Sequence, residues 1–218
     1  MRFFAELVTF AILLAFATSV ACAEEDNILI SFTGMDGRAP NGQLIADASG
    51  NLYGTTETGG GSIGCGHQGC GTAFRLATDG TLTTLHAFTG AGMHDGAIPT
   101  GILTVDSSGS LFGTTINGGN SNKKCGIANF RPRGCGTVFK IGPDGSETIV
   151  HNFGGSDGAL PESGVVMHKG KFYGTTYLGG NNSCEYGCGT IFQLGANGNQ
   201  KILYAFTGGV MAPTPSLG

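Results

Sequence analysis

Short segments of alternating hydrophobic and polar residues, separated by turn residues, make up most of this 218-residue chain. Residues 72–78 alternate in this way, which is typical of a strand with one buried face. An Asp-Gly step follows, and both residues tolerate the positive φ of a tight hairpin turn. A partner strand is therefore expected over 81–88, and a similar hairpin over 43–47 and 52–56.

The whole pattern recurs, because four short motifs return in the same order at a spacing of about 60 residues. Each recurrence has room for four short strands, and chance does not explain four motifs kept in one order. The motifs are aromatic-Gly-Thr-Thr at 53–56, 112–115 and 173–176, Cys-Gly-Thr-x-Phe from Cys70, Cys135 and Cys188, Asp-Gly-x-x-Pro at 36–40, 95–99 and 157–161, and Phe-x-Gly at Phe32, Phe88, Phe153 and Phe206.

Repeated four-stranded units predict an all-β fold, a β-propeller-like array of about three blades over 33–88, 89–153 and 154–206. The alternative is a β-trefoil, which also contains three four-stranded repeats. Residues 27–32 match the last strand of a repeat, and 207–218 match the start of a truncated fourth unit, so stray strands are expected at both ends. Since propellers close with typically four to eight blades, the array is expected to be incomplete. The alternatives are a fragment of a longer array, which the truncated unit favours, a chain that self-associates through open blade edges, and an incomplete arc.

The first 23 residues have the features of a secretory signal peptide. The apolar run over 7–21 is shorter than the ~20 residues that span a bilayer, and an Ala-Cys-Ala cleavage sequence follows it. Removal of 1–23 leaves a repeat domain over 24–218 with no membrane span. An uncleaved anchor and a lipoprotein acylated at Cys22 are the alternatives. The predicted location is secreted or extracytoplasmic, in the periplasm or at the cell surface.

Composition narrows the classes of partner. Glycine supplies 41 residues, many of them at the recurring turns, while charged residues make up 12% of the chain against about 25% in ordinary soluble domains. With a net charge of −4 and no large basic cluster, nucleic-acid binding is not expected. No phosphate-binding glycine loop and no nucleophile elbow occurs, so neither a cofactor nor a catalytic residue is assigned.

Six cysteines form three local pairs, each between the second and third strands of its repeat. The loop length varies while the second cysteine keeps its place before Gly-Thr, as a disulfide at the base of a variable loop would require. An exported chain meets an oxidising environment, which favours disulfides over zinc ligation with help from His67. The predicted pairs are Cys65–Cys70, Cys125–Cys135 and Cys184–Cys188.

Antiparallel connections alternate between the two edges of a blade, which places the cysteine loops and the Asp-Gly-x-x-Pro linkers on one face. Long loops on a rigid scaffold usually hold the binding residues, so this face is the candidate site. Its candidate binding residues are Asp36, Asp95, Asp157, His94, Arg131 and Tyr186.

The three linker aspartates occupy equivalent positions and could ring a central axis and hold a cation. The favoured interpretation is that each aspartate caps its own turn through a hydrogen bond to the backbone. His86 and His151 are also repeat-equivalent, with Tyr204 in the matching place, and are interpreted as surface positions of a strand.

The run of Asp-Gly-x-x-Pro, Leu-Tyr/Phe-Gly-Thr-Thr, Gly-Gly and Cys-Gly-Thr-x-Phe resembles the bacterial GloVer (Gloeo/Verruco) tandem-repeat family over nearly all of residues 27–218. The third repeat departs from the pattern at 167–171, where the hairpin lacks its aspartate. The resemblance implies an exported repeat protein and supplies no active site.

The leading functional hypothesis is a secreted, non-enzymatic binding or surface-interaction module for an unidentified protein or glycan. The alternatives are an extracellular propeller enzyme acting on sugars or lactones, and a non-functional fragment of a longer repeat protein. Turnover that depends on a metal and on Asp95 would distinguish the enzyme from the binding module.

Overall fold

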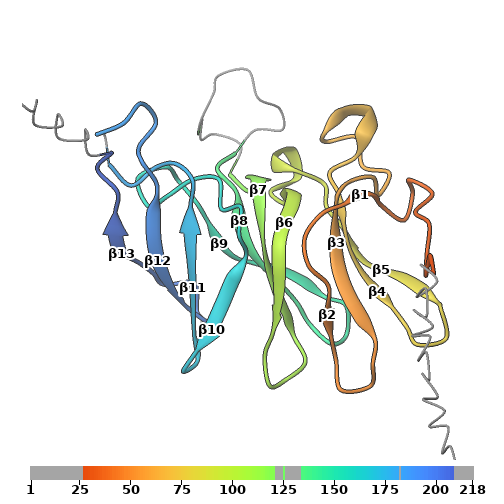
Figure 1. Cartoon of the computed structure of the whole chain (residues 1–218). Coiled ribbons are helices and arrows are strands. Elements are labelled where there is room, and N and C mark those ends of the chain that lie inside the picture. Colours follow the sequence, from red (N-terminus) through yellow and green to blue (C-terminus); the bar gives the residue numbers. More distant parts are fainter. Residues whose placement is uncertain (1–26, 121–124, 126–133, 182, 209–218) are drawn as a thin grey trace, which may run out of the picture.

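The computed structural model describes residues 27–120, 125, 134–181 and 183–208. Within these ranges the chain forms three separate antiparallel sheets in sequence order, which we call blades 1, 2 and 3 (Figure 1). Blade 1 contains β1 (Arg38–Pro40), β2 (Ile45–Ala46), β3 (Leu52–Thr58), β4 (Thr72–Leu76) and β5 (Leu82–Ala87); blade 2 contains β6 (Gly96–Val105), β7 (Leu111–Gly118), β8 (Thr137–Ile141) and β9 (Glu147–Asn152); and blade 3 contains β10 (Val165–His168), β11 (Lys171–Thr176), β12 (Thr190–Gly195) and β13 (Gln200–Ala205). Two 3₁₀ turns, η1 (Gly66–Gln68) and η2 (Ala91–Met93), lie in connecting segments.

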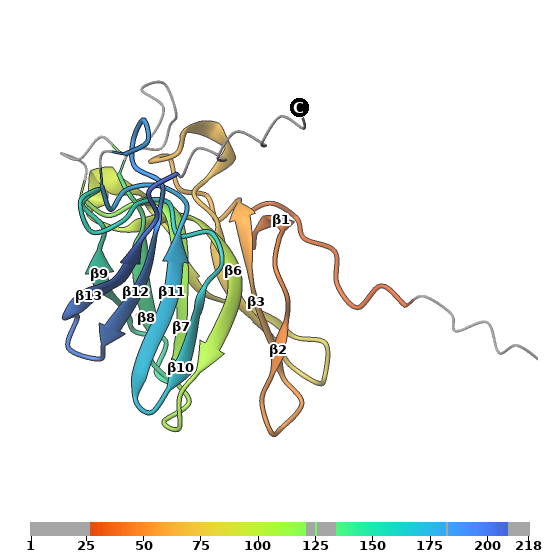
Figure 2. The same ribbon diagram turned by 60° about the vertical axis from the view of Figure 1, so that its left-hand side comes forward.

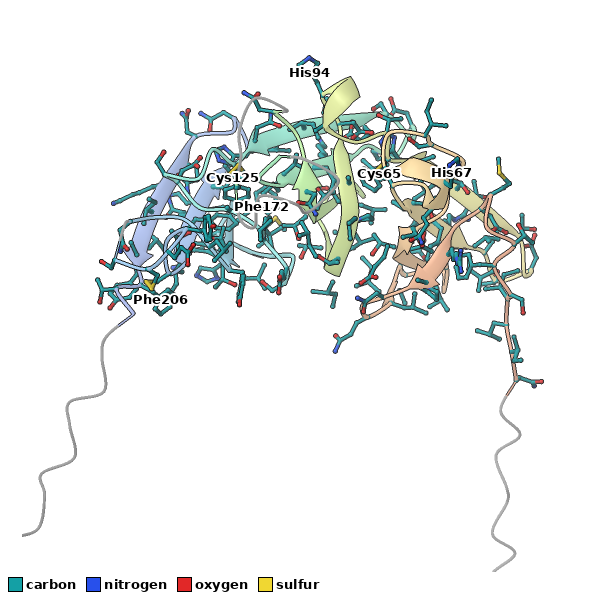
Figure 3. All side chains as sticks on the ribbon, turned by 90° about the horizontal axis from the view of Figure 1, so that it is seen from above. Cys65, His67, His94, Cys125, Phe172 and Phe206 are labelled. Atoms are coloured by element: carbon teal, nitrogen blue, oxygen red, sulfur yellow. A yellow bond between two sulfur atoms is a disulfide. The ribbon has the colours of Figure 1, made fainter. Side chains whose placement is uncertain are left out.

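The blades stand side by side in an open arc, which is clearest from above (Figure 3). Each blade runs from an inner strand to an outer one, with neighbouring strands hydrogen-bonded in the orders β6-β7-β8-β9 and β10-β11-β12-β13. In blade 1 the place of one inner strand is taken by two pieces, because β1 and β2 both pair with β3. Separate radial sheets define a β-propeller-like array, so the β-trefoil alternative is wrong for the described part of the chain.

The recurring motifs are explained by contacts inside each blade. In blade 2 a Cβ atom on Gly113 would lie 2.5 Å from the ring of Phe139, so only glycine leaves room for that ring. Thr115 and Thr137, at paired positions of β7 and β8, are fully buried and share a hydrogen bond of 2.8 Å between their hydroxyl oxygens. The same glycine–phenylalanine contact and the same threonine pair occur in the other blades. The second threonine of each Thr-Thr motif therefore serves packing between neighbouring strands.

The core lies between the blades, where phenylalanines pack edge to face. Phe88, at the end of blade 1, packs on Phe139 of blade 2 with ring centroids 5.0 Å apart, and Phe153 packs on Phe192 of blade 3 at 5.2 Å. All four side chains are buried. The Phe-x-Gly motifs at Phe88 and Phe153 therefore join one blade to the next. The edge-to-face arrangement is the one that ring quadrupoles favour.

The Asp-Gly-x-x-Pro segments differ from the linkers expected for them. In blade 1 Arg38–Pro40 forms β1, and in blade 2 the corresponding residues begin β6. The glycine after the aspartate allows this close pairing, because a Cβ on Gly96 would lie 2.5 Å from the Thr115 side chain. In blades 1 and 2 these segments thus belong to the inner strands, whereas in blade 3 Ala159 forms only an isolated bridge with Leu178 ahead of β10.

Several expectations fall on residues outside the described ranges. They are the signal peptide over 1–23 with Cys22, the basic loop containing Arg131, and most of the truncated unit over 207–218. Residues 27–32 are described and form no regular strand. Among the described residues, no helix is long and apolar enough to cross a membrane.

Candidate functional site

Disulfide-stapled loops gather on one face of the array. The pairs Cys65–Cys70, Cys125–Cys135 and Cys184–Cys188 are bonded, with Cα atoms 5.1, 5.0 and 5.3 Å apart, so the predicted pairing is confirmed. Figures 1 and 2 show the first and third of these loops at the top of the blades and the short hairpins at the bottom. Three disulfides suggest an oxidising environment for the folded chain.

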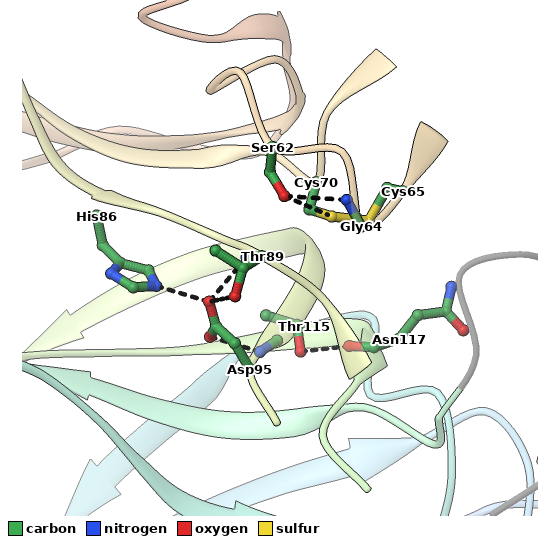
Figure 4. The surroundings of a disulfide bond; sticks show 10 residues. Ser62, Gly64, Cys65, Cys70, His86, Thr89, Asp95, Thr115 and Asn117 are labelled. Carbon is green, nitrogen blue, oxygen red and sulfur yellow. Dashed lines mark hydrogen bonds and ion pairs between the residues drawn. A yellow bond between two sulfur atoms is a disulfide. The ribbon is translucent and has the colours of Figure 1, made fainter. Parts of the chain in front are cut away.

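A groove lies beside the first stapled loop. It encloses about 600 Å³ between Gly60–Gly64 on one side and Ala87, Thr89 and Gly92 on the other. The Ser62 hydroxyl holds this loop in place, because Gly64 N–H donates to Ser62 Oγ at 3.3 Å and Ser62 Oγ lies 3.7 Å from Cys70 Sγ (Figure 4). Ile63 at the rim is 92% exposed. The groove thus combines exposed backbone, small side chains and one apolar residue.

The linker aspartates cap their own turns, as the favoured interpretation expected. Asp36 Oδ1 accepts a hydrogen bond from Thr33 N–H at 2.7 Å, and Asp157 Oδ1 accepts one from Gly154 N–H at 2.7 Å. Asp95 accepts from the backbone of Thr89 at 2.8 Å and from that of Gly96 at 2.6 Å. Each carboxylate is therefore committed to its own turn.

Two of these aspartates also bind a histidine from the preceding outer strand. His86 Nε2, on β5, donates to Asp95 Oδ2 at 3.0 Å, and His151 Nε2, on β9, donates to Asp157 Oδ2 at 2.9 Å (Figure 4 shows the first pair). Both histidines lie on outer strands, as interpreted, but their side chains are only 22% and 15% exposed. Strand alternation does not reveal the aspartate that the following connection brings beside each of them.

Glu147 completes a three-residue cluster at the junction of blades 1 and 2. It begins β9, the outer strand of blade 2. In the described part of the chain, its carboxylate is the only further one that lies close enough to share a metal ion with His86 and Asp95. One ligand atom from each of His86, Asp95 and Glu147 lies within 4.8 Å of the others. Among the described residues, this is the one group of three such side chains with metal-binding spacing.

The pKa values of the two carboxyls in the cluster are shifted in opposite directions. Burial alone would raise the pKa of Asp95, but hydrogen bonds from His86, Thr89 and Gly96 outweigh it and lower that pKa below its usual value. Burial and then the charge of Asp95 raise the pKa of Glu147 to about 7, with His86 partly opposing them. Glu147 Oε1 is buried without a hydrogen-bond partner, so no hydrogen bond offsets its loss of water.

The candidate binding residues do not converge on one pocket. His94 lies in a left-handed conformation at the end of η2 and points outward (Figure 3), whereas Asp95 beside it is buried. Tyr186 is 50% exposed on the third stapled loop. The aspartates are tied to separate turns, and among the described residues no cation-binding group includes more than one of them.

Compared with known proteins, the chain has distant structural likenesses. No family model matches the chain, and no curated protein matches it. Among solved structures, it is similar to a gluconolactonase from Xanthomonas campestris, with 14% identity, a TM-score of 0.45, and coverage of 78% of this chain and 48% of that one. It is also similar to a luciferin-regenerating enzyme, with 13% identity, a TM-score of 0.43, and coverage of 75% and 45%. The chain spans about half the length of these proteins. The three separate antiparallel sheets of the described residues make the class an all-β, β-propeller-like array, as predicted.

Proposed function

We propose that this chain is an extracytoplasmic, non-enzymatic β-propeller-type repeat protein, of the kind that the GloVer resemblance implies, and that its stapled face binds a protein or glycan. The groove beside the first loop is the observation on which the proposal depends. A disulfide rigidifies that loop before binding, which lowers the entropy lost when a ligand orders it. Exposed glycine backbone offers hydrogen-bonding groups, and Ile63 offers apolar contact.

The test is to fill the groove without disturbing the fold. Gly92 suits this purpose, because its φ is not positive and a Cβ there would meet no atom within 4 Å. Gly92→Trp should abolish binding to glycan and peptide arrays that retain the parent chain. Ser107→Trp, on an exposed hairpin of the opposite face, is the matched control and should bind normally. Binding that survives Gly92→Trp, or turnover of a sugar lactone by the parent chain, would refute this proposal.

We also propose that the array self-associates through the free side of blade 3. Phe206 is 42% exposed, whereas its repeat-equivalents Phe88 and Phe153 are buried against the next blade. Tyr204 already packs edge-on against Phe206 with centroids 5.0 Å apart, as His151 packs on Phe153. This surface corresponds to the sides of blades 1 and 2 on which the next blade packs.

A second copy of the chain has the complementary surface. On blade 1, Phe74 is covered by Phe32 at 5.1 Å, in a segment that forms no regular strand. Phe206 of one copy would take the place of Phe32 on Phe74 of another. Light scattering should then show a mass that rises with concentration, and Phe206→Asp should reduce it to that of a monomer. Ile63→Asp is the control at another exposed apolar residue. A monomer at every concentration would refute self-association.

A further inference from the structure

We propose that His86, Asp95 and Glu147 form a site for a transition-metal dication of the Zn²⁺ class at the junction of blades 1 and 2. The three ligand atoms lie within 4.8 Å of one another and come from β5, the turn before β6, and β9. Residues from two blades would therefore share one ion. The site adjoins the groove through Thr89, which lines the groove and donates to Asp95, but it does not depend on the proposed binding function.

The distance between the first two ligands fits a metal. Ligands about 2.1 Å from one ion lie about 3.0 Å apart in octahedral and about 3.4 Å apart in tetrahedral coordination. His86 Nε2 and Asp95 Oδ2 are already 3.0 Å apart. An ion between them would replace the shared proton, which would move to Nδ1 of the neutral ring. Glu147 then needs to approach by only about 1.5 Å to complete a three-ligand site.

The outer hydrogen bonds of the cluster would hold the ligands in place. Thr89 donates to Asp95 Oδ2 from its backbone nitrogen at 2.8 Å and from its hydroxyl at 3.0 Å. Gly96 N–H holds the other carboxylate oxygen at 2.6 Å. Ligating carboxylates are usually oriented by such partners, and the Asp95 carboxylate has them without any ion.

An internal comparison distinguishes this junction from an ordinary blade contact. The junction of blades 2 and 3 contains the same pair, His151 and Asp157, but the residue at the register position of Glu147 is Gln200. Its amide donates to the Asp157 carbonyl oxygen at 2.9 Å, so this site is satisfied without an ion. At the equivalent place Glu147 leaves a buried oxygen unpaired. An ion would supply the missing partner.

The donor set determines the class of ion. One imidazole with two carboxylates suits Zn²⁺ or its neighbours in the first transition row, whereas Ca²⁺ and Mg²⁺ prefer oxygen ligands alone. The three protein ligands leave at least one position for water or an outside group, as in open zinc sites.

The test uses the full oxidised chain, stripped with a chelator and titrated with Zn²⁺ by calorimetry and thermal unfolding. One equivalent should bind and raise the melting temperature. Glu147→Gln should lower the affinity at least tenfold, yet unfold no earlier than the parent without metal, because Gln200 shows that an amide fits this position. Glu162→Gln, at an exposed carboxylate, is the control and should bind as the parent does.

The converse variant is Gln200→Glu, which recreates the cluster at the junction of blades 2 and 3 and should add a second equivalent of Zn²⁺. This variant keeps the proposal testable if Glu147→Gln fails to fold. Zn²⁺ binding that is unchanged by Glu147→Gln would overturn the proposal, since surface histidines would then hold the ion. Binding of Ca²⁺ in preference to Zn²⁺ would overturn the assignment of the ion.

Discussion

Replacement of Phe153 by alanine should destabilise the chain far more than the same change at its repeat-equivalent Phe206. Phe153 is 1% exposed, packs on Phe192 at 5.2 Å and on His151 at 4.8 Å, and fills the junction of two blades. Deleting a fully buried phenylalanine side chain costs about 3–5 kcal/mol, through lost transfer free energy and the cavity left behind. Phe206 is 42% exposed and borders solvent, so we expect about 1–2 kcal/mol and no enclosed cavity.

The free energies of unfolding are to be measured by urea unfolding. Far-ultraviolet circular dichroism is the signal that monitors it, because the chain has no tryptophan. Dilute protein must be used first, since self-association through Phe206 would increase the cost of Phe206→Ala as concentration rises. Equal losses for the two variants at every concentration would refute the argument that Phe-x-Gly joins each blade to the next.

Three further predictions concern a loop, a turn and a motif. Replacing Cys65 and Cys70 by serine should lower the unfolding free energy by about 2 kcal/mol, because the disulfide closes a loop of only a few residues; the same change in reducing buffer should cost nothing. Burial alone would raise the pKa of Asp157, but hydrogen bonds from His151 and Gly154 lower it. Its contribution to the free energy of unfolding is therefore present above the pKa of the unfolded state and is lost as the pH falls through the lower pKa of the folded state. Asp157→Asn should therefore lower stability at neutral pH and flatten the acid limb of the stability–pH curve; an unchanged acid limb would contradict the assignment. Gly113→Ala should cost about 1–3 kcal/mol by overpacking the ring of Phe139, and thermal unfolding at parental temperature would show that this ring gives way freely.

The blades could be predicted because each motif acts within one repeat. Inside blade 2, Gly113 lies against Phe139 and Thr115 pairs with Thr137, so the Gly-Thr-Thr motif and the Gly-Thr-x-Phe motif of one repeat are each other's partners. Hydrophobic–polar alternation and the Asp-Gly turns then locate the strands. Because the sequence repeats, the same strands form in each blade. The cysteine pairs follow equally well, since both members lie in one loop.

The cluster of His86, Asp95 and Glu147 could not be predicted in the same way, because it joins two repeats. Glu147 lies in the outer strand of blade 2, and only the arrangement of neighbouring blades brings it beside His86 on the outer strand of blade 1. Strand alternation carries no information about that contact. The available signal was the comparison of equivalent positions, which reads Leu82, Glu147 and Gln200 along the three repeats.

That comparison also indicates which residues could give this chain a property of its own. The histidine–aspartate pair occurs at both junctions, and in each case the aspartate caps the turn between blades, so the pair by itself is part of the repeat architecture. Glu147 is different. The amide of the equivalent Gln200 donates to the Asp157 carbonyl oxygen, whereas Glu147 Oε1 is buried without a hydrogen-bond partner. A repeat protein that needed only to stack its blades would gain stability from an amide at both places. The unpaired oxygen of Glu147 is therefore a feature that stacking of the blades does not explain. Exchanging Glu147 and Gln200 should move the metal site from one junction to the other.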